Sequence, residues 1–285
     1  MIKKLVAFDW AIKRLLRQKA NFVVLEGFLS ELLFENIKIE QILESESNQE
    51  TDEDKFNRVD ILTKNSKNEL IIIEIQSNYE IDYFHRMAYG TSKAISENQK
   101  LGDKYSNVKK VISINIVYFD LGQGEDYIYK GKTVFKGLNQ NDILSLSEKQ
   151  KFTFVKKEIS DIFPEYYILK VNKFNDIAKN TLDEWVYFLK NIEVKETFKA
   201  KGLKEANEVL DFMRLPKEEQ YGYNRFMDNL SVKASEMFSL QNEEEFKVRE
   251  EIAKKAIQNN ANNEFISLIT GLTIENIEKL RKDAL

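Results

Sequence analysis

The sequence predicts an α/β protein in which a mixed central sheet is flanked by helices and followed by an all-helical C-terminal region. Two observations support this fold class. Runs of β-branched residues at 70–76 and 110–120 alternate with segments whose apolar residues recur at helical spacing. From about residue 176 onward the helical spacing continues, while Gly and Pro almost vanish. We therefore expect a core at 1–175 and a helical region at 176–285.

The N-terminal part predicts one long helix over about 21–35. Its apolar residues fall on one stripe, formed by Leu25, Phe28, Leu29, Leu32 and Leu33. Asp9 is a candidate N-cap for a short helix before it. The following segment, 44–57, is acidic and lacks periodicity, which indicates a solvated loop.

A hairpin, a helix and a buried strand follow. Val59–Leu62 and Leu70–Gln76 have the pattern of strands, and the polar segment 64–69 between them is typical of a turn. Residues 79–105 predict a helix that ends near Gly102. Its apolar residues in helical phase are Ile81, Phe84, Ala88 and Ile95. The long β-branched run at 110–120 suits a strand buried on both faces.

Less regular segments complete the predicted sheet, and helices complete the chain. Further strands are predicted at 126–135, 152–159 and 166–171. Helices are predicted at 181–191, 203–215, 243–260 and 263–283. Pro216 and Gly271 interrupt this helical region, and Thr273 is a candidate N-cap for the last helix.

The composition excludes several kinds of site. The 285 residues contain no Cys, so thiolate metal ligands and a cysteine nucleophile are absent. His85 is the single histidine, which leaves little from which to build a multi-histidine zinc site or a Ser-His-Asp triad. Without a signal peptide or a membrane-spanning apolar run, we expect a cytoplasmic protein that does not enter a membrane. The net charge of −4 argues only weakly against nucleic acid, because binding depends on local basic patches.

The predicted hairpin combines an isoleucine-rich strand with three polar residues. Because side chains alternate across a strand, Glu74 and Gln76 share one face with Ile72. The hairpin brings Asp60 beside Glu74, and two carboxylates in a desolvated place repel each other unless a positive group lies between them. Mg²⁺ would suit these oxygens, with the backbone carbonyl of Ile75 as a further ligand. An ion pair between Glu74 and a Lys or Arg is the alternative, and the spacing alone favours it.

The motif formed by Asp60, a short hairpin and 74-EIQ-76, followed by a helix that carries Arg and Tyr, resembles the PD-(D/E)XK nuclease superfamily. It is most similar to the branch of recombination-promoting nucleases or putative transposases. The segments that also resemble this branch are 9–33, 83–105, 111–119, 181–191 and 269–277. The resemblance implies a restriction-endonuclease-like core and a metal-dependent DNA endonuclease, with Mg²⁺ or Mn²⁺ as cofactor.

The resemblance also implies roles for individual residues. Asp60 and Glu74 match the acidic metal ligands of the motif, and Gln76 stands where the superfamily usually has Lys. Glu31 resembles an additional acidic residue near the metal, and Glu26 is a rival for that role. An amide can orient a water but cannot accept a proton at neutral pH, so the metal would have to supply most of the activation.

Other residues near the motif have both a functional and a structural interpretation. Arg86 and Tyr89 share one face of the helix after the hairpin and are candidate contacts to DNA phosphate, with an Arg–carboxylate ion pair as the alternative. Gln99 and Tyr105 are candidates of the same kind, with solvation of the helix end as the alternative. His85 has no evident orienting partner, so we expect a surface or packed residue.

Two further clusters have the same double interpretation. Basic residues gather near the N-terminus, at Lys13, Arg14, Arg17 and Lys19. This cluster either steers DNA or forms the solvated face of a helix. Aromatic residues gather at Trp185, Tyr187 and Phe188. We expect them to pack the C-terminal helices onto the core and not to stack on bases.

The leading hypothesis is therefore a Mg²⁺-dependent DNA endonuclease with a link to recombination or mobile elements, and a homodimer is its candidate assembly. The alternative is a catalytically degenerate nuclease-like module that acts in DNA binding or protein interaction. The acidic net charge and the amide at Gln76 favour this alternative. An RNA substrate is a third hypothesis.

Overall fold

The computed structural model describes residues 15–16, 22–45, 60–209 and 217–283. The expected cap at Asp9, the basic cluster near the N-terminus and most of the acidic segment lie outside these residues. The chain divides into two compact units, Met1–Leu215 and Pro216–Leu285, and each is described by itself. The expected boundary between residues 175 and 176 stays a prediction. No helix among the described residues is long and apolar enough to cross a membrane.

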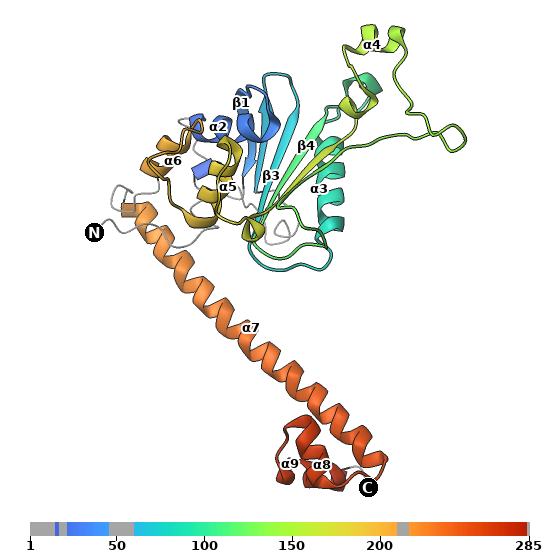
Figure 1. The fold of residues 1–285 in the computed structure, drawn as a ribbon, viewed down its shortest axis with the longest axis vertical. Helices are drawn as coiled ribbons and strands as arrows, with labels where there is room; N and C mark the ends of the chain where they lie inside the picture. The colour runs from blue at the N-terminus through green and yellow to red at the C-terminus, as the bar shows by residue number, and fades with distance from the viewer. Residues whose placement is uncertain (1–14, 17–21, 46–59, 210–216, 284–285) are drawn as a thin grey trace. The chain divides into compact units, whose positions relative to one another are not determined.

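The first unit is built on a six-stranded mixed sheet with the strand order β1-β2-β3-β4-β6-β5 (Figure 1). Strands β1 to β3 pair antiparallel, β3, β4 and β6 pair parallel, and β5 pairs antiparallel with β6. The strands are β1 (Ile39–Ser45), β2 (Ile61–Asn65), β3 (Leu70–Gln76), β4 (Val111–Val117), β5 (Ile128–Gly131) and β6 (Glu165–Lys170). This is the mixed sheet that the sequence predicts.

Helices cover both faces of the sheet. The helices of the first unit are α2 (Val23–Leu33), α3 (Tyr83–Glu97), α4 (Glu148–Phe154), α5 (Thr181–Asn191) and α6 (Leu203–Val209). Helix α3 lies on one face, while α2, α5 and α6 pack together on the other (Figure 1). The aromatic residues of α5 pack into this second layer, since the rings of Trp185 and Phe28 are 5.5 Å apart. The expected packing role is thus confirmed for Trp185, which is fully buried.

The two central strands explain why the sheet needs two covering layers. Every residue of β4 is buried, and so are Leu70–Ile75 of β3. Nearly continuous apolar runs of this kind are typical of parallel strands between two layers of helix. Ile72 packs against Ala94 of α3, and Glu74 lines a small cavity together with residues of that helix. The expected alternation along β3 is therefore confirmed.

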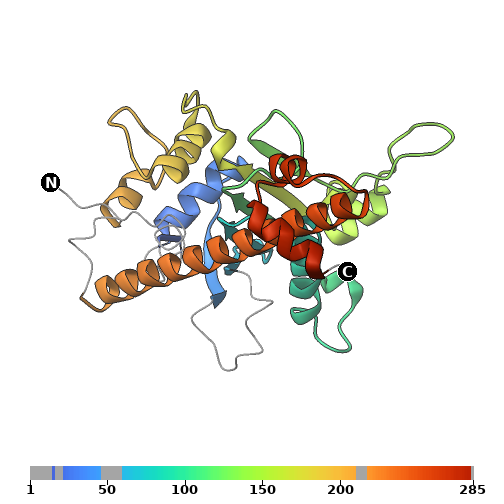
Figure 2. The same ribbon diagram turned by 90° about the horizontal axis from the view of Figure 1, so that it is seen from below.

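The structure corrects the prediction at 152–159. This segment is not a strand, because α4 ends at Phe154 and a 3₁₀ turn, η3 (Ile159–Asp161), follows. The Ser147 side chain accepts a hydrogen bond from the Gln150 N–H, and the Gln150 side chain accepts one from the Ser147 N–H. This reciprocal capping box starts a helix despite the β-forming residues that follow. Figures 1 and 2 show α4 and the adjoining loops extending beyond the sheet.

Other elements differ in extent from the prediction. Strand β1 was not expected, and it adds an edge strand beside β2. Strand β5 covers only four residues of the segment 126–135. Helix α3 forms as predicted, but the stripe used to predict it is mostly solvent-exposed, at Ile81, Phe84 and Ala88. The buried stripe is Tyr83, Met87, Thr91 and Ala94. The sequence pattern did not predict this stripe because Tyr83 and Thr91 carry polar hydroxyl groups. Both hydroxyls make hydrogen bonds inside the protein.

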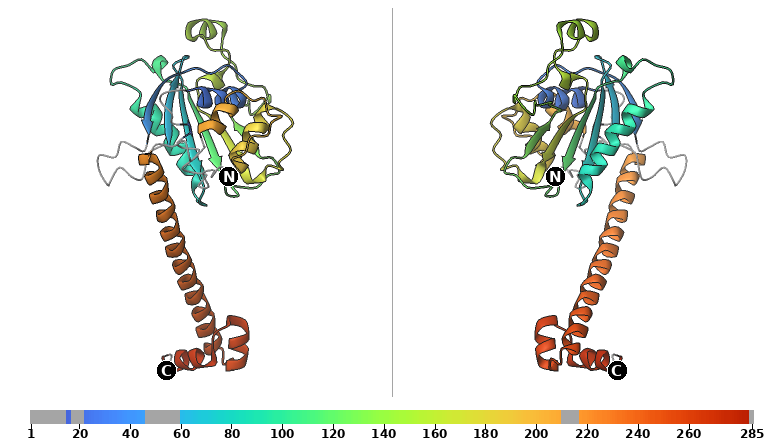
Figure 3. Two further views of the ribbon diagram at one scale, coloured as in Figure 1. Left: turned by 90° about the vertical axis from the view of Figure 1, so that its left-hand side faces the viewer. Right: turned by 90° about the vertical axis from the view of Figure 1, so that its right-hand side faces the viewer.

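The second unit is a small helical bundle. It consists of α7 (Lys217–Gln258), α8 (Asn263–Thr270) and α9 (Ile274–Asp283). Figure 3 shows α7 as one continuous helix followed by the α8–α9 hairpin. The core of the bundle is formed by Ala253, Ile266, Leu272, Ile277 and Leu280. Gly271 takes a left-handed conformation after α8, and the Thr273 side chain accepts a hydrogen bond from the Asn276 N–H, as a capping residue does.

Candidate metal-binding site

Asp60 lies immediately before β2, and only 3% of it is exposed. The β2–β3 pairing ends at Ile61 and Ile73, and the same register extended by one residue puts Asp60 across from Glu74. The N–H of Ile75 donates a hydrogen bond of 2.7 Å to Oδ2 of Asp60. The carboxylate therefore takes the place that a backbone carbonyl of the neighbouring strand has in a regular ladder.

The same contact orients the carbonyl group of Ile75. In an antiparallel pair, the N–H and the C=O of one residue point toward the same neighbouring strand. Because the Ile75 N–H points to Asp60, the Ile75 carbonyl oxygen also lies on that side of β3. Asp60, Glu74 and the Ile75 carbonyl thus occupy neighbouring positions at the open end of the hairpin, away from its turn. Hard oxygen donors of this kind fit Mg²⁺ or Mn²⁺.

Glu74 is also nearly buried, with 9% of the residue exposed. One of its carboxylate oxygens lies 3.4 Å from Nη2 of Arg86 on α3. The Arg–carboxylate pair that the sequence left open is therefore present. Among the described residues, no group of three or more Asp, Glu or His side chains forms a ready-made metal cluster. A cation at this place would share Glu74 with Arg86.

A third acidic residue of the site, Glu80, was missed in the sequence. Its carboxylate accepts hydrogen bonds from Nε2 of Gln76, at 2.6 Å, and from Nη1 of Arg86, at 2.8 Å and 3.1 Å. Glu80 follows β3 in the loop that leads to α3. The loops at the carboxyl ends of parallel strands commonly carry ligand-binding residues, and this position is the signal that could have found it.

The electrostatics of the site are negative around Tyr83 of α3. This residue is fully buried, and its hydroxyl donates to Oδ1 of Asn115 at 3.2 Å. Burial raises the pKa of Tyr83, and the negative charges of Glu74, Asp60 and Glu80 raise it further, while Arg86 opposes them. The phenol therefore stays neutral, and it remains a hydrogen-bond donor next to the two motif carboxylates.

Arg86 carries the positive charge of the site. Burial by itself lowers the pKa of Arg86, but the neighbouring Glu74 and Glu80 carboxylates raise it above its ordinary value. The guanidinium therefore stays charged, and about two fifths of its side chain is exposed. A small cavity adjoins this group under α3. Its lining residues are Ile72, Glu74, Tyr83, Arg86, Met87, Gly90, Thr91, Ser113 and Asn115.

The two candidate acids on α2 have other partners. Glu31 accepts a hydrogen bond from the Thr181 hydroxyl at the start of α5. Glu26 is buried, accepts the Ile39 N–H at 2.9 Å and forms an ion pair with Lys38 at 2.9 Å. Glu26 therefore holds the beginning of β1, and Glu31 ties α2 to α5.

The remaining candidates lie farther out on α3 and beyond it. Tyr89 is half exposed, one turn from Arg86. His85 is exposed, as expected of a surface residue. Gln99 donates a long hydrogen bond, 3.4 Å, to the Lys104 carbonyl, and Tyr105 is almost fully exposed. The structure therefore brings Arg86 to the Glu74 carboxylate and leaves Tyr89, His85 and Tyr105 exposed.

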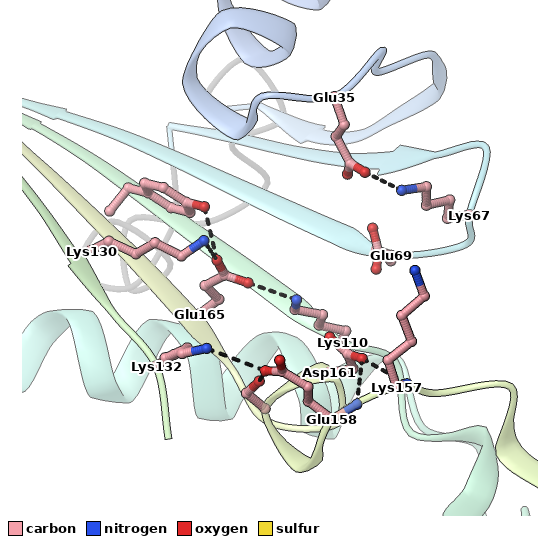
Figure 4. Close-up of polar contacts among 12 residues, drawn as sticks. Glu35, Lys67, Glu69, Lys110, Lys130, Lys132, Lys157, Glu158, Asp161 and Glu165 are labelled. Carbon is pink, nitrogen blue, oxygen red and sulfur yellow. Dashed lines mark hydrogen bonds and ion pairs between the residues drawn. The ribbon is translucent and has the colours of Figure 1, made fainter. Parts of the chain in front are cut away.

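A second charged cluster lies at the opposite end of the parallel strands. Figure 4 shows Glu165, at the start of β6, between Lys110 and Lys130. Burial by itself raises the pKa of Glu165, but hydrogen bonds from Lys110, Lys130 and Tyr167 together lower it to about 2. Both positive groups are close partners of this carboxylate, so the cluster has the character of a structural ion-pair network.

Comparison with protein families matches residues 6–238 to the family described as PD-(D/E)XK nuclease family transposase. The match includes the β2–β3 hairpin and all of the helices and strands of the first unit from α2 to α6. No curated protein and no solved structure matches the chain. The mixed sheet with flanking helices agrees with the restriction-endonuclease-like fold of this family.

Proposed function

Since this chain belongs to the PD-(D/E)XK nuclease family transposases, we propose that it is a metal-dependent endonuclease that hydrolyses phosphodiester bonds in DNA. The observation that carries the proposal is the placement of Asp60 across from Glu74, with the Asp60 carboxylate bound to the Ile75 N–H. Asp60 and Glu74 are the residues that resemble the nuclease motif, and they lie at the start of β2 and on the paired strand β3.

Each residue of the site has a definite part in this proposal. Asp60, Glu74 and the Ile75 carbonyl would hold Mg²⁺ or Mn²⁺. Such an ion polarises a phosphate and lowers the pKa of a coordinated water. Gln76 would orient the attacking water through its amide, because it has no charge and no proton-accepting group at neutral pH. Arg86 would contact a phosphate oxygen through its exposed guanidinium.

A second candidate function is a nuclease-like module without catalysis, which binds DNA or protein. The ion pair between Arg86 and Glu74 favours it, because Arg86 already supplies a positive partner to one of the two motif carboxylates. The amide at Gln76 favours it as well. The proposal also includes a link to recombination or mobile elements. It further includes assembly as a homodimer, which light scattering on the purified protein tests.

Plasmid nicking separates the two functions. The purified full-length chain is incubated with supercoiled DNA, with Mg²⁺, with Mn²⁺ and with EDTA. The endonuclease proposal predicts nicking that requires the metal and that is lost in Asp60→Ala and Glu74→Ala. A matched control is Glu97→Gln, which removes a partly exposed acid that pairs with Lys93 on α3. Absence of nicking with every metal, or equal nicking by wild type and both alanine variants, contradicts the enzymatic proposal. A parallel assay with RNA tests the third hypothesis.

A further inference from the structure

Glu80 binds two side chains of the site at once. Its carboxylate accepts a hydrogen bond of 2.6 Å from Gln76 and two hydrogen bonds from Nη1 of Arg86. The Glu80 side chain is 28% exposed, so these contacts are partly shielded from water. Glu80 therefore connects Gln76, which stands at the motif lysine position, to the Arg86 guanidinium, which contacts Glu74.

The contact with Gln76 decides which end of the amide faces the site. An ionised carboxylate only accepts hydrogen bonds, so the Gln76 NH₂ group must point toward Glu80. The carbonyl oxygen of Gln76 is then directed away from Glu80. A water next to the motif carboxylates can donate a hydrogen bond to this oxygen, which orients the lone pairs of the water. Without Glu80, both directions of the amide would be open.

The contact with Arg86 holds a positive charge beside a proposed cation site. A divalent cation on Glu74 and the Arg86 guanidinium repel each other because both are positively charged, and they also compete for the same carboxylate. Glu80 supplies Arg86 with a second carboxylate at a shorter distance, 2.8 Å compared with 3.4 Å for Glu74. Arg86 can therefore stay at the site when Glu74 binds a cation, and its Nη2 group can turn to a phosphate.

We infer that Glu80 is a positioning residue of the proposed endonuclease, which sets the direction of the Gln76 amide and retains Arg86. This inference rests on the proposed function. A merely structural interpretation is that Glu80 links the loop before α3 to the helix through the Arg86 side chain. The two interpretations differ in what they predict for substitutions that keep the fold.

The test compares Glu80→Gln and Glu80→Asp in the full-length chain, with Glu97→Gln as control. Glutamine keeps the size of Glu80, but its amide can pair with Gln76 in either direction. Aspartate is shorter but remains an acceptor for both partners. We expect a kcat for plasmid nicking about tenfold or more below wild type in Glu80→Gln, a smaller loss in Glu80→Asp, and unchanged melting temperatures. Because Glu80 acts through Gln76, Glu80→Gln should cost clearly less in a Gln76→Ala background.

Different results separate the two proposals. Wild-type nicking that Asp60→Ala abolishes, together with a Glu80→Gln variant as active as Glu97→Gln, overturns the role of Glu80 and leaves the endonuclease intact. Higher activity in Glu80→Gln than in Glu80→Asp also overturns the role of Glu80. The length of the side chain, and not its ability to accept two hydrogen bonds, would then determine activity. Absence of metal-dependent nicking in the wild type overturns the endonuclease, and the role of Glu80 with it.

Discussion

The Ile75 N–H donates a hydrogen bond of 2.7 Å to the Asp60 carboxylate, at the point where β2 begins. Asp60 thus has a structural role that is separable from the proposed binding of a metal. Asp60→Asn keeps an oxygen that can accept the Ile75 N–H, whereas Asp60→Ala leaves this buried donor without its acceptor. We expect Asp60→Ala to lower the free energy of unfolding by about 1–3 kcal/mol and Asp60→Asn to lower it less, as measured by urea denaturation.

Both Asp60 variants should lose nicking to a similar extent. The asparagine carries no charge, and losing several kcal/mol of metal-based stabilisation corresponds to roughly a hundredfold or more in rate. The comparison therefore separates folding from chemistry. An Asp60→Asn variant that nicks plasmid at the wild-type rate would show that the negative charge of this carboxylate is not needed for nicking.

Replacement of Gln76 by lysine should raise activity. The lysine would have Glu80 as a ready ion-pair partner, because Glu80 already binds the Gln76 amide at 2.6 Å. A charged group near the attacking water can take part in proton transfer, so we expect roughly a tenfold or larger increase in the initial nicking rate. Gln76→Met has a similar length without hydrogen bonding and should lower the rate. A lysine variant no faster than wild type would contradict this prediction.

Glu165 should make the stability of the first unit depend on pH. Its pKa is lowered from 4.5 to about 2 in the folded protein, so the folded state binds the proton less readily than the unfolded chain. This stabilisation is fully present above pH 4.5 and is lost as the pH falls to about 2, with a magnitude of about 3 kcal/mol. Glu165→Gln should therefore reduce stability at neutral pH and flatten its decline across this acidic range.

The measurement for Glu165 is urea denaturation at a series of pH values, and Glu148→Gln is a suitable control. Glu148 forms an exposed ion pair with Lys151 on α4, and such pairs contribute little. If Glu165→Gln and Glu148→Gln have the same pH dependence, the Lys110–Glu165–Lys130 network does not stabilise the fold.

Gly27 allows α2 to approach the segment before α6. A Cβ atom at this position would collide with the carbonyl oxygen of Lys201, which also accepts a hydrogen bond of 3.2 Å from the Trp185 indole. We expect Gly27→Ala to destabilise the protein by about 1–3 kcal/mol, because the backbone or the indole must move. Gly131→Ala is the control, since its Cβ would make an ordinary contact with Tyr166. Equal melting temperatures for the two variants would contradict the close packing.

Two truncations test where the first unit ends. A chain ending at residue 215 keeps the whole sheet and helices α2 to α6, so we expect it to unfold cooperatively in thermal circular dichroism. A chain ending at residue 175 loses α5, with the fully buried Trp185 and Phe188, and should not fold. A folded protein from the shorter chain would support the boundary expected from composition alone.

The sequence by itself determined the elements whose pattern is local. The Leu stripe predicted α2, the β-branched runs predicted β3 and β4, and alternation placed Glu74 and Gln76 on one face. Sequence patterns gave a wrong prediction where the side chains did not have the apolar or helix-forming character that the structure requires. The buried stripe of α3 contains tyrosine and threonine, and the capping box at Ser147 outweighed the β-forming residues of α4.

Only the tertiary structure decided which polar groups meet. Arg86 and Glu80 reach the motif because the chain turns back over the sheet after β3. Sequence spacing alone does not predict which groups the ends of these long side chains contact. Glu26 and Glu31 look alike on α2, yet one binds the start of β1 and the other binds α5. Such contacts depend on how packed elements are oriented over long stretches of chain. The sequence therefore identifies Asp60 and Glu74 as a pair, and the fold supplies the partners that surround them.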